Sequence, residues 1–215
     1  MTELNAAMQK LAIPHRMRTL PVDDRGYLVP KFVKWIDGKP DFRVIDIEHL
    51  NRCVRHKFCW LCGEKLGAHM AFVIGPMCAV NRVNSEPPSH LECAHFAVQA
   101  CPFMAFPQRK RNDVDLPIGA QDAAGITIDR NPGATLIWVT KSYKIFQAGN
   151  GLLFQLGDPE KVEWWSRGRT ATREEVMHSI QTGLPTLLRI AEEEGPKAVK
   201  ALAKKTEEAM ALLPA

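Results

Sequence analysis

Two cysteine-containing pairs restrict the fold of this chain more than any other feature of its sequence. The first is Cys59-Trp-Leu-Cys62 followed by Gly63, and the second is His90-Leu-Glu-Cys93. Two residues between thiolates allow both sulfurs to point to the same side of a tight turn, and the glycine allows the chain to curl beneath them. Each pair is typical of one half of a zinc site. The sequence therefore predicts that Cys59, Cys62, His90 and Cys93 bind one zinc ion.

The second pair lies where a helix is expected to begin. Two prolines precede it, and Ser89 with Glu92 has the S-x-x-E spacing of a capping box. We therefore expect a helix from Ser89 to about Cys101, where another proline ends it. His90 and Cys93 would then share one face of its first turn.

The arrangement of these segments is similar to that of a known metal-binding module. A knuckle, a hairpin-like stretch around Gly75-Pro76 and a helix that brings two further ligands resemble a treble-clef zinc finger over residues 59 to about 100. The resemblance implies that the first pair supplies the knuckle ligands and the second pair the helix ligands. Most of the chain also resembles uncharacterised bacterial and phage-associated proteins with CWxCG and MCAVNR…EPPSH…CA…CPF blocks, which implies no particular activity.

The number of ligands favours a structural role for the metal. A structural zinc has four protein ligands, whereas a catalytic zinc keeps one position for water. The sequence also lacks a P-loop, a dinucleotide fingerprint, a nucleophile elbow and a metalloprotease helix. We therefore assign no catalytic residue and interpret the protein as a non-enzymatic accessory or adaptor factor that binds nucleic acid or another protein.

A zinc-dependent hydrolase is one alternative. Glu92 lies in a His-x-Glu pattern that resembles zinc deaminases, although the order of the motifs is reversed and a capping box already accounts for this residue. His95, or His69 before the zinc helix, would be the general base of a nuclease of the HNH type.

An iron–sulfur protein is the other alternative. Cys101-Pro102 is typical of the end of a cluster-binding run, so Cys59, Cys62, Cys93 and Cys101 would supply four thiolates. Two helical turns separate the last two cysteines, so the helix between them would have to end early or bend.

Composition indicates a globular protein of a reducing compartment. The chain has 215 residues, of which 46% are hydrophobic, and a net charge of +4. It has neither the apolar core of a secretory signal near its N-terminus nor the about 18 consecutive apolar residues of a membrane span. We expect a cytoplasmic location without membrane contact, where six cysteines are ligands or free thiols rather than disulfides.

The mildly basic charge permits contact with nucleic acid. One basic run lies in a connection over residues 107–133, and two arginines follow a tryptophan further along the chain. An aromatic ring beside arginines can stack on bases, although a solvated arginine face beside a partly buried tryptophan gives the same pattern. The candidate nucleic-acid-binding residues are Arg109, Lys110, Arg111, Trp165, Arg167 and Arg169.

The pattern of the whole chain predicts an α+β fold. Residues 26–46 are expected to form a hairpin around Asp37-Gly38, and residues 46–57 a helix with Asp46 as its N-cap. We place the hairpin and the zinc module in residues 1–106, the surface connection in 107–133, and strands followed by helices in 134–215, all packed as one unit.

The C-terminal part is expected to contain strands and three helical segments. The strands are Ala134–Thr140 and Leu152–Leu156. A capping box at Thr172 begins a helix that stops at Gly183. Two further helical segments cover Leu184–Glu194 and Pro196–Leu213.

Overall fold

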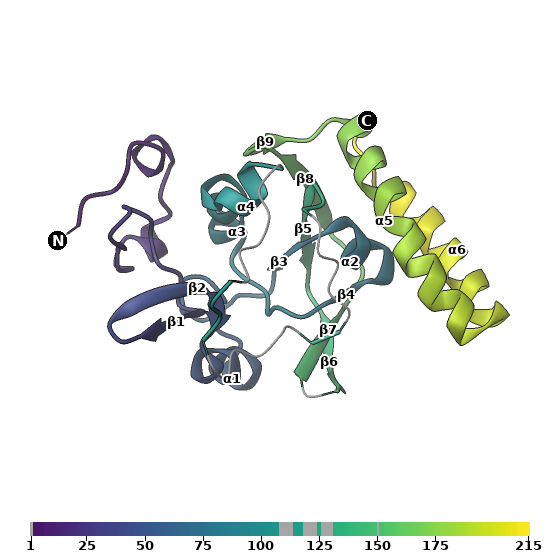
Figure 1. Ribbon diagram of the computed structural model, residues 1–215, viewed down its shortest axis with the longest axis horizontal. Coiled ribbons are helices and arrows are strands. Elements are labelled where there is room, and N and C mark those ends of the chain that lie inside the picture. Colours follow the sequence, from purple (N-terminus) through teal and green to yellow (C-terminus); the bar gives the residue numbers. More distant parts are fainter. Residues whose placement is uncertain (1, 108–113, 118–123, 126–130, 150) are drawn as a thin grey trace.

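The protein has the predicted α+β class, with antiparallel sheets and helices (Figure 1). The structure is a computed structural model that describes residues 2–107, 114–117, 124–125, 131–149 and 151–215. The strands are β1 (Val33–Ile36), β2 (Lys39–Ile45), β3 (Met70–Ile74), β4 (Val83–Asn84), β5 (Thr135–Thr140), β6 (Tyr143–Ala148), β7 (Gly151–Leu156), β8 (Lys161–Ser166) and β9 (Arg169–Thr170). The helices are α1 (Ile47–His56), α2 (Pro76–Asn81), α3 (Leu91–Ala100), α4 (Pro102–Ala105), α5 (Arg173–Glu194) and α6 (Pro196–Met210), with short 3-10 helices η1 (Met8–Lys10) and η2 (His15–Met17).

The N-terminal hairpin and the helix after it are confirmed. Strands β1 and β2 pair antiparallel around Asp37 and Gly38, which have φ of 49° and 76°. Such positive values at both central residues are what a two-residue hairpin turn requires. Helix α1 begins directly after Asp46, whose carboxylate accepts a hydrogen bond from the His49 backbone N–H. The predicted cap therefore fixes the start of α1.

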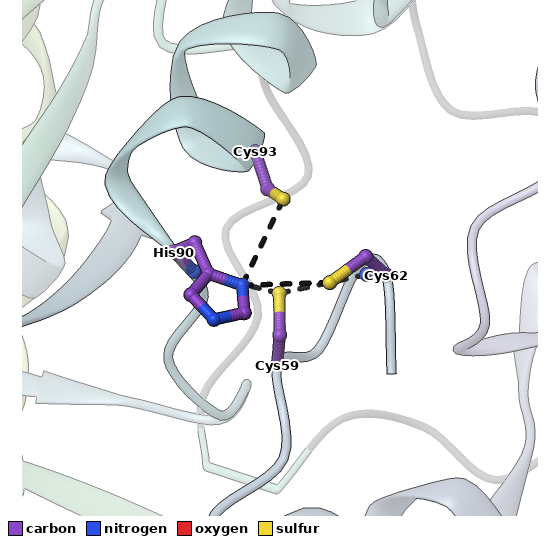
Figure 2. A group of neighbouring side chains, drawn as sticks. All are labelled: Cys59, Cys62, His90 and Cys93. Atoms are coloured by element: carbon purple, nitrogen blue, oxygen red, sulfur yellow. Dashed lines mark hydrogen bonds between the residues drawn. The ribbon is translucent and has the colours of Figure 1, made fainter. Parts of the chain in front are cut away.

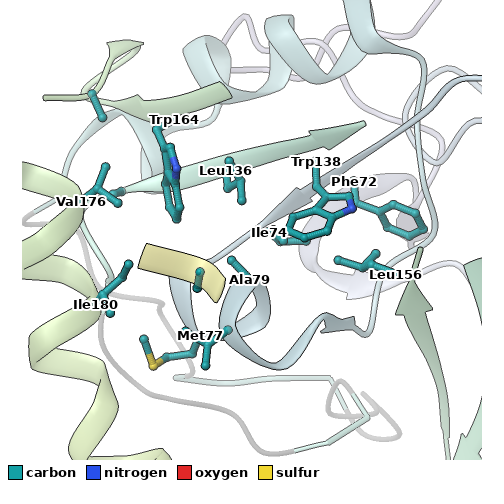
Figure 3. Close-up of a cluster of buried hydrophobic side chains, with 14 of the residues drawn as sticks. Phe72, Ile74, Met77, Ala79, Leu136, Trp138, Leu156, Trp164, Val176 and Ile180 are labelled. Atoms are coloured by element: carbon teal, nitrogen blue, oxygen red, sulfur yellow. The ribbon is translucent and has the colours of Figure 1, made fainter. Parts of the chain in front are cut away.

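A four-stranded sheet in the order β3-β5-β8-β9 forms the centre of the molecule. Strand β5 is buried at every position, because α3 covers one face of the sheet and α2, β7, α5 and α6 pack on the other. On the second face Trp138 lies opposite Phe72 of β3, and Leu136 opposite Trp164 of β8. Figure 3 shows these side chains gathered with Ile180 of α5 in one apolar cluster. A smaller sheet in the order β4-β7-β6 lies beside it.

The helical C-terminus differs from its prediction in two respects. The capping box of Thr172 and Glu175 is present, but α5 does not stop at Gly183. It continues through Pro185 to Glu194, and Gly183 is buried within it. The favourable burial of the apolar face of α5 outweighs the low helix propensity of glycine and the hydrogen bond that proline removes. Helix α6 ends at Met210, three residues before the predicted Leu213.

The stretch around Gly75-Pro76 is not the expected hairpin. Pro76 instead occupies the first turn of α2, a position where its fixed φ favours a helix. Strands β3 and β4 on either side of α2 belong to different sheets. Strand β8 includes Trp164 and Trp165 and had not been predicted.

Candidate metal centre

The first pair of cysteines lies in a tight knuckle. Phe58 and Lys65 form an antiparallel bridge that closes it, and the Cys59 N–H donates to the Glu64 carbonyl at 2.7 Å. Gly63 donates to the Cys59 carbonyl and has a φ of +79°, a conformation that costs glycine little. The knuckle therefore has the geometry that its spacing predicted, with the buried Cys59 and Cys62 on one side.

The second pair lies at the start of α3, but the predicted capping box is absent. Helix α3 begins at Leu91, so His90 is its N-cap residue and only Cys93 lies in the helix. Ser89 is instead buried next to β3, where its backbone N–H and C=O exchange hydrogen bonds with Ala71 at 2.7 and 2.8 Å. This pairing with a strand far away in sequence holds Ser89 outside the helix.

The two pairs meet in one compact group. The ligand atoms of Cys59, Cys62, His90 and Cys93 all lie within 4.8 Å of one another. His90 Nδ1 is 3.4 Å from Cys62 Sγ and 3.9 Å from Cys93 Sγ (Figure 2). A tetrahedral zinc with ordinary Zn–S and Zn–N bonds places sulfur and nitrogen about 3.6 Å apart. Three thiols and one imidazole therefore have both the chemistry and the spacing to hold a metal ion.

Hydrogen bonds with backbone groups orient two of its members. Cys59 Sγ accepts the backbone N–H groups of Cys62 at 3.5 Å and of His90 at 3.4 Å. His90 Nε2 lies 3.1 Å from the Lys65 carbonyl, which can only accept, so this nitrogen carries the proton. That tautomer leaves the lone pair of Nδ1 free for a metal, as in metal-bound histidines whose other nitrogen donates to a carbonyl.

The proximity of these groups alters their acidity. Burial opposes ionisation of Cys59, but hydrogen bonds from Cys62, Cys93 and His90 prevail and lower its pKa. Hydrogen bonding to the sulfurs of Cys59 and Cys62 raises the pKa of His90 to about 10. The same two neighbours raise the pKa of Cys93. In the absence of a metal, these contacts thus favour a thiolate at Cys59, a protonated His90 and a neutral thiol at Cys93.

The remaining cysteines do not join the group. Burial raises the pKa of Cys53 to about 12 and of Cys78 to about 11, and it also raises the pKa of Cys101. Helix α3 runs without interruption from Leu91 to Ala100, so Cys101 lies at its far end from Cys93. His90, and not Cys101, completes the group of four.

The three side chains considered for catalysis each contact another side chain. Glu92 accepts a hydrogen bond from Arg16 at 3.0 Å, and Arg16 also pairs with Glu64 of the knuckle. His69 is exposed and lies 2.9 Å from Glu160. His95 Nε2 lies 2.5 Å from Glu163, and its ring contacts Trp165. Among the described residues, none of the three belongs to the ligand group.

The residues considered for nucleic-acid binding are only partly described. Arg109, Lys110 and Arg111 lie outside the described residues. Trp164 is buried, and Trp165 is partly buried against α3. Arg169 donates two hydrogen bonds to Glu175, at 2.8 and 2.9 Å, and Arg167 lies 3.9 Å from the same carboxylate. These two arginines therefore have an acidic partner within the chain.

Sequence reasoning missed the contribution of the N-terminal segment. Met8, Met17, Leu20 and Leu28 are buried in one apolar cluster with the cysteine ligands. Arg16 extends from this segment to both halves of the metal centre, through Glu64 and Glu92. The apolar residues gave a weak helical signal, but nothing in their spacing indicated what they would contact.

No helix among the described residues combines the length and the apolar character needed to cross a membrane. Comparisons with family profiles, with curated proteins and with solved structures gave no match. The metal-ligand geometry of Cys59, Cys62, His90 and Cys93 is therefore the feature on which a functional assignment depends.

Proposed function

We propose that Cys59, Cys62, His90 and Cys93 hold one Zn²⁺ ion in a closed structural site. We further propose that the protein is a non-enzymatic accessory factor whose metal-stabilised surface binds nucleic acid or another protein. The observation that carries the proposal is the convergence of three sulfurs and one imidazole nitrogen within 4.8 Å.

The donor set favours zinc over other cofactors. Thiolate and imidazole ligands in a four-coordinate group are typical of structural zinc, whereas hard cations such as Mg²⁺ prefer oxygen. An iron–sulfur cluster most often has four cysteine ligands, and here histidine takes the fourth position. The bound ion would join the knuckle to the start of α3, as in the treble-clef fingers that this region resembles.

The surroundings of the group favour a structural role over a catalytic one. Cys59, Cys62 and Cys93 are buried, and four protein ligands complete a tetrahedral shell without a water molecule. A hydrolytic zinc would also require a general base beside it. Glu92 pairs with Arg16 instead, at a distance of 3.0 Å.

Metal analysis of two matched variants tests the proposal. Cys93→Ser removes one proposed ligand, and Cys101→Ser removes a cysteine at the other end of α3. We expect one zinc per chain in the native protein and in Cys101→Ser, and a large loss of zinc affinity in Cys93→Ser. Equal zinc affinity of both variants would contradict the ligand assignment. A brown protein that contains iron and loses its colour in Cys101→Ser would replace zinc by an iron–sulfur cluster.

A further inference from the structure

A basic hollow lies directly beside the knuckle. It has a volume of about 430 Å³ and is lined by Arg55, His56, Lys57, Phe58 and Lys65. The four basic side chains are exposed, and Phe58 is partly buried. Arg55 and His56 belong to the last turn of α1, where positive charge is favoured by the helix dipole. Lys57 and Lys65 lie outside that helix, so the dipole does not account for the whole cluster.

The cations of this hollow have no acidic partner among the described residues. Within the described part of the chain, no carboxylate forms an ion pair with Arg55, Lys57 or Lys65, nor with the neighbouring Arg52. Arg167 and Arg169, which the sequence indicated as candidates for nucleic-acid binding, differ from these cations because both lie near the Glu175 carboxylate. Unpaired like charges that converge on one hollow repel one another, and an anionic ligand would relieve that repulsion.

The backbone of the hollow is held by the metal knuckle. Lys57 accepts a hydrogen bond from the Leu66 N–H at 2.8 Å, and Phe58 bridges to Lys65. The Lys65 carbonyl is also the acceptor for His90 Nε2. The Arg52 guanidinium lies 5.0 Å from the centre of the Phe58 ring, which holds a further cation beside the hollow. The backbone of Lys57, Phe58 and Lys65 is therefore held in place by hydrogen bonds within the knuckle.

We propose that this hollow binds the backbone phosphates of nucleic acid. The proposal rests on the accessory role above and identifies its partner. Exposed arginine and lysine side chains are the usual ligands of phosphate oxygens. The centre of a protein interface is depleted of charged residues, whereas surfaces that bind nucleic acid are strongly positive. Arg52 covers the Phe58 ring, so the contacts are to phosphates and do not depend on base sequence.

Binding of labelled DNA by two charge-matched variants tests the proposal. The first variant combines Arg55→Gln, Lys57→Gln and Lys65→Gln. The control combines Lys197→Gln, Lys200→Gln and Lys205→Gln on the exposed face of α6, which removes the same charge elsewhere. Fluorescence anisotropy measures the affinity for a short duplex and for a single strand over a salt series.

We expect the hollow variant to bind at least tenfold more weakly than the control. Its plot of log affinity against log salt should also become shallower by about 2 to 3, because each phosphate contact contributes about 0.9 to the slope for duplex DNA. Equal affinities and equal slopes for the two variants would overturn the proposal. So would native protein that binds neither form of DNA.

Competition experiments distinguish nucleic acid from other anions. We expect unlabelled DNA to displace the labelled strand at far lower concentration than polyglutamate or inorganic phosphate. Equal competition by polyglutamate would overturn the proposal in favour of an acidic protein. Zinc content is measured on the same samples, so failure of the metal assignment is recognised separately from failure of the hollow to bind DNA.

Discussion

The two large apolar clusters of this protein are built in different ways. The cluster on the sheet contains large side chains from regular elements, such as Phe72, Trp138 and Phe154, all fully buried. The cluster around the knuckle contains the three cysteines of the metal centre and many side chains from short 3-10 helices and loops, with Met70 of β3 and Phe96 of α3 beside them. Regular strands and helices supply most of the first cluster, whereas irregular segments supply much of the second. The comparison indicates that apolar packing stabilises one side, and that the bound metal we propose would stabilise the other.

The largest expected effect is the loss of the metal. Cys59→Ser removes the sulfur that accepts two backbone N–H groups, and structural zinc contributes about 10 kcal/mol or more of binding free energy in zinc-finger peptides. We expect the variant to lose bound zinc and the hydrogen-exchange protection of residues 58–66. Protection of β5 should persist. Simultaneous loss of protection in β5 would show that the two clusters form one cooperative unit.

A core substitution on the sheet side is the converse experiment. Trp138 is fully buried in β5, and its Nε1 donates to the Gly157 carbonyl at 3.0 Å. Trp138→Ala should lower the free energy of unfolding by about 3 to 5 kcal/mol through cavity formation. Urea denaturation measures this loss, and the folded variant should retain one zinc per chain. Reduced zinc content under native conditions would contradict the division between the two sides.

Glu86 lies between β4 and α3, in the segment that connects the sheet side of the molecule to the knuckle side, and its pKa is shifted. Burial raises the pKa of Glu86 from 4.5 to about 7, so the folded state disfavours its charged form. The contribution of Glu86 to the free energy of unfolding is therefore fully present below about pH 4.5, and it is lost as the pH rises through about 7. Glu86→Gln should therefore be more stable than the native protein by about 1 to 2 kcal/mol at pH 8, and similar to it at pH 4.5.

Thermal denaturation at the two pH values measures the effect of Glu86→Gln. Glu160→Gln provides a control, because the pKa of this carboxyl is shifted in the opposite direction. The hydrogen bond from Lys141 and a smaller contribution from His69 lower the pKa of Glu160. The control should show no stabilisation at pH 8. A Glu86→Gln variant that gains nothing between pH 4.5 and pH 8 would contradict the burial of this charge.

The smallest expected effect is that of Arg16, which bridges the two halves of the metal centre. Its guanidinium contacts Glu64 and Glu92 at the surface, where solvent and salt screen ion pairs. Arg16→Ala should lower the melting temperature by less than Glu86→Gln raises it at pH 8. The decrease caused by Arg16→Ala should vanish at high salt. A salt-independent decrease would show that Arg16 acts through packing instead.

Local patterns predicted the group of Cys59, Cys62, His90 and Cys93 well, because each half of the group is encoded within four residues. Asp46 and Thr172 were likewise recognised as helix caps from neighbouring residues. Ser89 was assigned wrongly because its backbone pairs with Ala71 of β3, a contact that no local pattern reveals. The continuation of α5 through Gly183 has the same origin, since it depends on burial against the distant sheet.

The basic hollow was missed for a related reason. Arg55, Lys57 and Lys65 are ordinary solvated residues in the sequence, and only the closure of the knuckle brings them together. Arg167 and Arg169, in contrast, lie close together in the sequence, but in the structure both pair with the carboxylate of Glu175. Whether a cation is neutralised within the chain depends on tertiary structure.

The pairing of Ser89 with Ala71 has a consequence for aggregation. Strand β3 lies at the edge of the four-stranded sheet, and Ser89 occupies hydrogen-bonding groups that this edge would otherwise offer to another chain. The next residue, His90, is one of the proposed zinc ligands, so a bound metal would also hold this cover in place. Removal of zinc would release the cover and expose β3 to pairing between molecules. Zinc would then act as a safeguard against self-association as well as a structural ion.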